Sequence, residues 1–194
     1  MDAVNWQEWI PALALAIALA ACAGLRAWLP LLLAGGMART GLLELGERFE
    51  FLTSDKALIL FLAATLLEIV ADKIPVLDHA LDALSTVLRP AAGALLAAAV
   101  IGRFADPLTA VALGIAVGAP TALVPHALKS VVRATATTLT GGLANPVISV
   151  VEDVSTFTLV ILAVLVPTLV IALFAAAAYL LLRSRRDRRS PAPA

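Results

Sequence analysis

Acidic and basic side chains gather in the middle of a chain that is otherwise strongly apolar. Glu68 and Asp72 close one apolar segment, and Asp78, His79 and Asp82 follow within the next ten residues. Carboxylates enclosed by apolar segments are typical of proton and cation pathways in membrane proteins. A histidine beside an acid, as His79 is beside Asp78, can also serve as a general base.

Two further polar stripes occur at helical spacing in the second half of the chain. His126, Lys129 and Arg133 are spaced i, i+3 and i+7, so they share one helix face, and their basic groups could contact an anion. Asn145 and Glu152 are seven residues apart and share a face in the same way. The candidate residues for an ion or ligand pathway are Glu68, Asp72, Asp78, Asp82, Arg89, His126, Lys129, Arg133, Asn145, Glu152 and Asp153.

Composition indicates whether these side chains lie in a soluble or a membrane protein. The chain has 194 residues, of which 61% are hydrophobic and 14% charged, with a mean hydropathy of +0.98. Soluble domains carry about 25% charged residues, so this balance predicts a protein of the lipid bilayer. The net charge of zero argues against a nucleic-acid partner. Cys22 is the single cysteine, which excludes an intrachain disulfide.

The apolar segments predict an all-α fold, a polytopic transmembrane helix bundle with about five spans in one domain over residues 1–182. The five expected spans are residues 9–25, 56–71, 90–101, 107–128 and 156–182, the last with a kink at Pro167. Residues 27–39 are too short to cross a bilayer alone, and they form either the far half of a broken helix or a re-entrant segment.

Proline positions predict two short re-entrant or interfacial helices, over residues 76–88 and 146–155. Pro75 and Pro90 delimit the first, and Asn145 followed by Pro146 is a good helix start for the second, after a bend at the paired glycines 141 and 142. The segments "PVLDHALD" and "PVISVVED" resemble each other. Paired broken segments of this kind indicate a possible inverted repeat, as in many transporters.

The chain ends in a basic segment, residues 183–194, which is expected to be disordered. It contains five arginines directly after the last span: Arg183, Arg185, Arg186, Arg188 and Arg189. The positive-inside rule therefore predicts a cytoplasmic C-terminus. The first 25 residues contain acids but no lysine or arginine, which favours the opposite side for the N-terminus and an odd number of crossings.

Three stretches carry a resemblance to a known family. "AGLRAWLPLLLAG", "EIVADKIPVLDHALDALSTVLRPAAGALLAAAV" and "GGLANPVISVVEDV" are similar to a bacterial integral membrane family, the domain of unknown function 4126. The similarity covers about residues 20–170, and it departs at Arg26, where the family is expected to carry an uncharged polar residue. The resemblance implies a multi-pass protein of the bacterial inner membrane and brings no activity with it.

Three functions remain open on these observations. The first is a small transporter or channel for an ion, small molecule or lipid, with charges lining a hydrated cavity. The second is a membrane scaffold or assembly factor, in which the same charges form dry bridges between helices. The third is an enzyme that acts on lipid, although the common catalytic motifs are absent from the sequence and no catalytic residue, metal or cofactor is assigned. Association with further copies of the chain also remains open.

Overall fold

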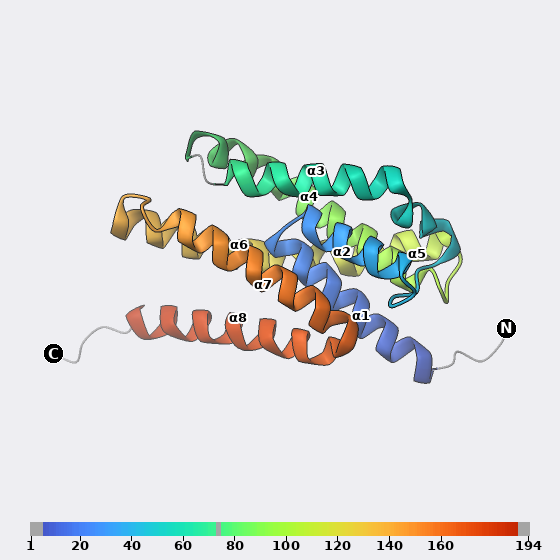
Figure 1. Cartoon of the computed structure of the whole chain (residues 1–194). Coiled ribbons are helices and arrows are strands. Elements are labelled where there is room, and N and C mark those ends of the chain that lie inside the picture. The colour runs from blue at the N-terminus through green and yellow to red at the C-terminus, as the bar shows by residue number, and fades with distance from the viewer. Residues whose placement is uncertain (1–5, 73–74, 190–194) are drawn as a thin grey trace.

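The computed structural model describes residues 6–72 and 75–189, which form an all-α bundle, as the sequence predicts (Figure 1). The elements in the described residues are α1 (Trp6–Leu25), α2 (Trp28–Arg39), the 3-10 helix η1 (Glu47–Thr53), α3 (Asp55–Ala71), α4 (Pro75–Ile101), α5 (Pro107–Leu113), the π-helical turn η2 (Gly114–Gly118), α6 (Ala119–Thr140), α7 (Asn145–Leu165) and α8 (Pro167–Arg189). Helix α1 is central and packs against α4, α6, α7 and α8. The first span thus forms the axis around which the others assemble.

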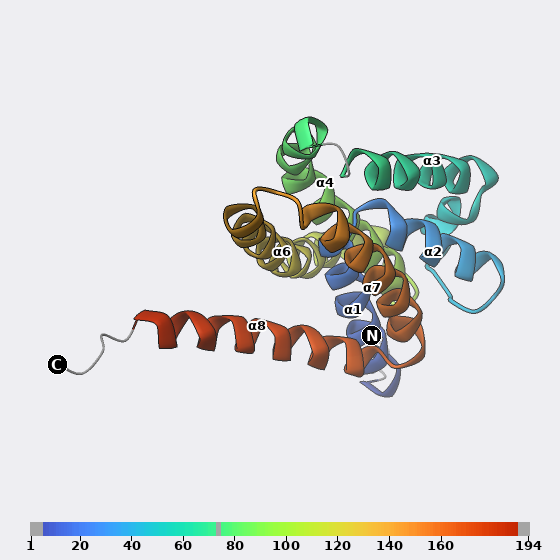
Figure 2. The same ribbon diagram turned by 60° about the vertical axis from the view of Figure 1, so that its left-hand side comes forward.

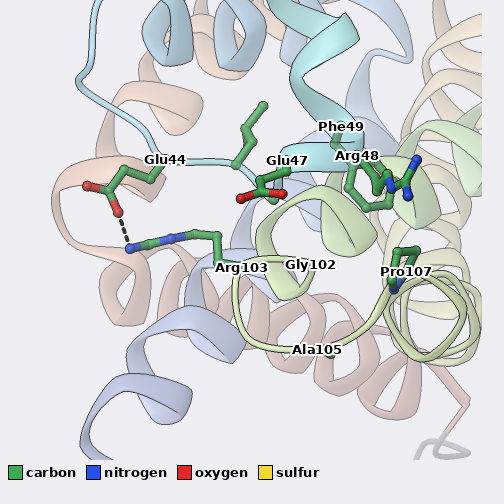
Figure 3. Close-up of a pocket in the computed structure, with 10 residues that line it drawn as sticks. Glu44, Glu47, Arg48, Phe49, Gly102, Arg103, Ala105 and Pro107 are labelled. Carbon is green, nitrogen blue, oxygen red and sulfur yellow. Dashed lines mark hydrogen bonds and ion pairs between the residues drawn. The ribbon is translucent and has the colours of Figure 1, made fainter.

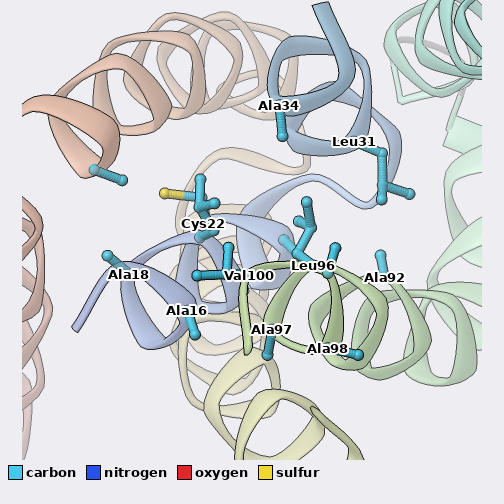
Figure 4. Packing of buried hydrophobic residues seen from close by; sticks show 14 of the residues in the cluster. Ala16, Ala18, Cys22, Leu31, Ala34, Ala92, Leu96, Ala97, Ala98 and Val100 are labelled. Atoms are coloured by element: carbon cyan, nitrogen blue, oxygen red, sulfur yellow. The ribbon is translucent and has the colours of Figure 1, made fainter. Parts of the chain in front are cut away.

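Small side chains let α1 and α4 pack closely. Figure 4 shows Ala16 and Cys22 of α1 beside Leu96, Ala97 and Val100 of α4, all of them buried. Lipid tails are as apolar as these side chains, so helices in a bilayer associate through close packing, which small residues permit. The alanine-rich sequence of both helices therefore explains why they form the core.

A close backbone approach joins α4 to the π-helical turn. A Cβ atom on Gly118 would lie 2.4 Å from the carbonyl oxygen of Gly93, and a Cβ on Gly93 would lie 2.8 Å from that of Gly118. Each of these two positions therefore requires a glycine.

Four stretches in the described residues are long and apolar enough to cross a membrane: Trp6–Leu25, Leu84–Ile101, Pro107–Thr140 and Asn145–Leu165. Helix α3, with 17 residues, and the apolar part of α8, Leu169–Leu180, are shorter. The predicted single span over residues 156–182 is wrong. Helix α7 ends at Leu165 and α8 begins at Pro167, because proline lacks the N–H that a continuous helix needs there. Figures 1 and 2 show a sharp turn between the two helices.

The predicted short helices over residues 76–88 and 146–155 are also wrong. The first is the beginning of α4, which continues through Pro90 to Ile101, and the second is the beginning of α7. Both helices start at the same end of the bundle and run in the same direction (Figures 1 and 2). Elements related by an inverted repeat would run in opposite directions.

The two ends of the described chain lie at opposite ends of the bundle. Helix α1 begins at the right of Figure 1 and α8 ends at the left. Helix α8 continues to Arg189, so residues 183–189 are helical where the sequence predicted a disordered tail, and residues 190–194 lie outside the described residues.

Candidate functional site

The site is built around a break between α1 and α2. Helix α1 ends at Leu25, and α2 begins at Trp28 without a side-chain cap from its own N-terminal flank. Glu68 of α3 supplies the missing acceptor, because its carboxylate accepts from the backbone N–H of Ala27 at 3.3 Å and of Trp28 at 3.4 Å. A carboxylate at a helix N-terminus is favoured by the free N–H groups and the helix dipole.

Arg26 occupies this break and is only 1% exposed. Its guanidinium pairs with Asp72 of α3 and with Asp153 of α7, the latter through Nη2 and Oδ1 at 2.7 Å. It also donates to the hydroxyl of Ser149 at 2.9 Å. One side chain thus joins the end of α1 to two other helices.

Asp72, at the end of α3, is shared by three cations. The first is Arg26. Oδ2 of Asp72 also lies 2.9 Å from Nη2 of Arg133 and 3.7 Å from Nζ of Lys129. Glu68 precedes it by four residues, so both carboxylates leave the same face of the helix.

The basic stripe of α6 faces the acids of α7. Arg133 binds Glu152 with two parallel hydrogen bonds, from Nε at 3.2 Å and from Nη2 at 2.9 Å. Lys129 lies 2.8 Å from Oε2 of Glu152 and donates to the carbonyl of Leu25 at 3.4 Å. Bidentate pairing between arginine and a carboxylate is among the strongest of protein hydrogen-bonding arrangements.

Arg89 of α4 completes the arrangement from the opposite side. Its Nη1 lies 2.5 Å from Nδ1 of His126, and its Nη2 lies 3.8 Å from Oε1 of Glu68. It is 1% exposed, like Arg26.

These side chains form what we call the charge cluster. It contains four cations and four carboxylates: Arg26, Arg89, Lys129, Arg133, Glu68, Asp72, Glu152 and Asp153. The formal charges cancel when His126 is neutral. Close pairing offsets part of the desolvation penalty, which amounts to several kcal/mol for each buried ion.

Eight of the eleven predicted pathway residues meet in or beside the cluster. They are Glu68, Asp72, Arg89, His126, Lys129, Arg133, Glu152 and Asp153. Asn145 does not, and it does not cap α7 either: its amide donates to Thr137 at 3.0 Å, at the junction between α6 and α7. The side chains of Asp78 and Asp82 lie outside the described residues.

Sequence reasoning missed Arg26 as a site residue. It directly follows the first expected span, residues 9–25, and is the first lysine or arginine in the chain. A lone charge after 25 residues without a basic side chain is the signal that could have identified it.

Two cavities reach the charge cluster from different sides. One of about 390 Å³ lies between α6, α7 and α8, and the cluster residues in its wall are Lys129 and Glu152. A smaller cavity of about 160 Å³, bounded by α3 and α4, has Glu68 in its wall. A third cavity, of about 570 Å³, is formed by segments 44–49 and 102–107, where Arg103 pairs with Glu44 (Figure 3), and is a separate site.

Comparison with known proteins identifies the family to which the chain belongs. No curated protein and no solved structure matches the chain. The family described as domain of unknown function 4126 matches residues 13–187, which is most of the chain and includes every residue of the charge cluster. The helices and the sequence together therefore identify this chain as a multi-pass membrane protein and a member of the family of domain of unknown function 4126.

Proposed function

We propose that the protein is a small transporter and that the charge cluster is its polar site. The observation that carries the proposal is the convergence of eight charged side chains on one buried site, one from the break between α1 and α2 and the others from α3, α4, α6 and α7. A charge in the membrane interior costs from about 3 to more than 10 kcal/mol, depending on the scale used. Charges retained against such a penalty are expected to serve a function.

Structural need alone accounts poorly for the cluster. Buried ion pairs replaced by well-packed apolar side chains often leave stability unchanged or improved. Small apolar residues already hold α1 against α4, so a bundle of these helices does not require four buried cations. The break at Arg26 adds to the argument, because interrupted helices expose backbone groups that can bind a transported ion.

The scaffold remains the second candidate, and direct pairing favours it. Each cation in the cluster has a carboxylate within 4 Å, and Arg133 holds Glu152 in bidentate geometry. A locked set of bridges would fix the helices for another purpose, such as assembly with a partner. The two proposals differ in whether the cluster ever opens to water.

Thiol labelling tests this difference without knowledge of the substrate. Because Cys22 is the only cysteine, a Cys22→Ala background permits single reporters. Ser149→Cys places a thiol beside Arg26, in a position that is fully buried. Transport by alternating access predicts that a membrane-impermeant thiol reagent labels this position in both right-side-out and inverted vesicles.

Val160→Cys is the matched control, because Val160 is equally buried on α7 but belongs to the apolar core. It should stay unlabelled from both sides. Protection of Ser149→Cys from both sides, in a protein with native thermal stability, would contradict the transporter and favour the scaffold.

We also propose that the protein resides in the bacterial inner membrane with its C-terminus in the cytoplasm.

A further inference from the structure

The cavity between α6, α7 and α8 has apolar walls and a charged inner end. Its lining is apolar except for Lys129, Glu152 and Ser155. Ligand sites are commonly clefts of roughly 300–1,000 Å³ with apolar walls and a few polar groups that fix the orientation of the ligand. The volume of about 390 Å³ falls within that range.

The charged end of this cavity favours an incoming hydrogen-bond acceptor. Both oxygens of Glu152 are already bound, Oε1 by Arg133 at 3.2 Å and Oε2 by Arg133 and Lys129 at 2.9 and 2.8 Å. Lys129 carries three N–H donors, and only the contact with Glu152 is short, since its other contacts are at 3.4 and 3.7 Å. An anionic head can therefore bind Lys129, whereas a cationic head meets a carboxylate that is already paired with Arg133 and Lys129.

The walls provide room for an alkyl chain. Pro125 and Phe174 line this cavity and also a neighbouring apolar cavity of about 220 Å³ between α1, α6 and α8. The apolar surface is thus continuous past Phe174. Figure 2 shows the C-terminal part of α8 extending away from the other helices of the bundle.

We propose that this cavity binds an anionic amphiphile from the surrounding bilayer, with its acidic head at Lys129 and its alkyl chain between α6, α7 and α8. The inference rests on the proposed transporter, for which it names the substrate class. Such a ligand would enter sideways from the lipid, so its head reaches the charge cluster while its chain stays in apolar surroundings.

Equilibrium binding to the full-length protein in a neutral maltoside detergent tests the proposal, with radiolabelled dodecyl phosphate as the probe. Dodecyl phosphate should bind saturably. Dodecanol, dodecyltrimethylammonium and inorganic phosphate should compete at least about tenfold more weakly, which corresponds to about 1.4 kcal/mol. Equal competition by dodecanol or by the cation would overturn the assigned head chemistry, and equal competition by inorganic phosphate would overturn the role of the chain.

Two positions on α7 supply a matched pair of variants. Val151 lines the cavity and Val150 does not, and both are about half exposed, at 59% and 49%. Val151→Trp should fill the cavity and weaken dodecyl phosphate binding about tenfold or more, whereas Val150→Trp should leave it unchanged. Val147→Phe, at another lining position, replaces Val151→Trp if that variant fails to fold. Unchanged binding in the folded lining variant overturns the proposal.

These experiments can disprove the lipid site and the transporter independently of each other. Saturable binding that Val151→Trp abolishes, together with a Ser149→Cys thiol protected from both sides, would leave the lipid site in place and remove the transporter. Labelling of Ser149→Cys from both sides, without binding of dodecyl phosphate, would support the transporter and overturn the lipid site.

Discussion

Arg89 Nη1 lies 2.5 Å from His126 Nδ1, and this contact fixes the protonation of the imidazole. A guanidinium can only donate, so Nδ1 must accept and the ring is neutral, with its proton on Nε2. The same arginine lies 3.8 Å from Glu68. Arg89 is therefore held between a neutral base and a carboxylate, and the balance of charge in the cluster depends on His126.

Substitution of His126 should separate the role of the acceptor from the role of the ring. In His126→Asn, the amide oxygen is attached to Cγ, as Nδ1 is in histidine. It can therefore accept a hydrogen bond from Arg89. In His126→Leu this acceptor is lost, which should lower the free energy of unfolding by about 1–3 kcal/mol relative to His126→Asn. Thermal unfolding in detergent measures the difference. The higher helix propensity of leucine offsets only a small part of this loss, so equal stability of the two variants would contradict the assignment.

Arg133 and Glu152 should show strong coupling in a double-mutant cycle. Both are buried, so Arg133→Gln or Glu152→Gln alone leaves a charge without its bidentate partner and should lower stability by about 3–5 kcal/mol. The double variant should regain much of this loss, because Lys129 and Asp72 lie 3.7 Å apart and can neutralise each other. Thermal unfolding of the three variants checks the cycle. Mild single variants would show instead that water screens these charges.

Gly118 should tolerate no side chain. Gly118→Ala places a methyl group 2.4 Å from the Gly93 carbonyl, so α4 and η2 must separate and stability should fall by about 1–3 kcal/mol. Gly36→Ala is the control, because nothing lies within 4 Å of its new Cβ atom in α2. That change should be neutral or stabilising by about 0.5–1 kcal/mol, since alanine favours a helix. A neutral Gly118→Ala would contradict the close approach of α4 and η2.

The C-terminus should lie in the cytoplasm. The prediction rests on the arginines that follow the apolar part of α8. A C-terminal alkaline phosphatase fusion, active only outside the cytoplasm, should be inactive, and a C-terminal green fluorescent protein should be bright. The same fusions after Arg39 provide an internal comparison. An active C-terminal phosphatase would reverse the proposed topology.

Local patterns predict which residues share a helix face, because each pattern depends on the spacing within one helix. Glu68 with Asp72, and His126 with Lys129 and Arg133, share a face through spacing alone. The bend at Gly141 and Gly142 was likewise predictable, since both adopt a positive φ, which glycine favours. Spacing within one segment does not identify the partner helix, so the pairing of Arg133 with Glu152 and Asp72 was not derivable.

Proline was the least reliable guide to helix ends. The sequence predicts a boundary at Pro90, yet α4 passes through it. It predicts a kink at Pro167, which instead begins a new helix. A proline inside a helix removes one hydrogen bond, and packing against neighbouring helices can offset that loss. Arg26 was missed for a related reason: its role depends on α3 and α7, which lie far away in the sequence.

The position of Arg26 imposes an order on biogenesis. Asp72 follows Arg26 by 46 residues and Ser149 follows it by 123 residues, so both partners are synthesised later. Until α3 has been synthesised, the guanidinium has none of these ligands, and it can stay near the headgroups only if α1 waits in a shallow position. We therefore expect α1 and α2 to reach their final depth in the bilayer only after α3 and α7 have been synthesised and can pair with Arg26.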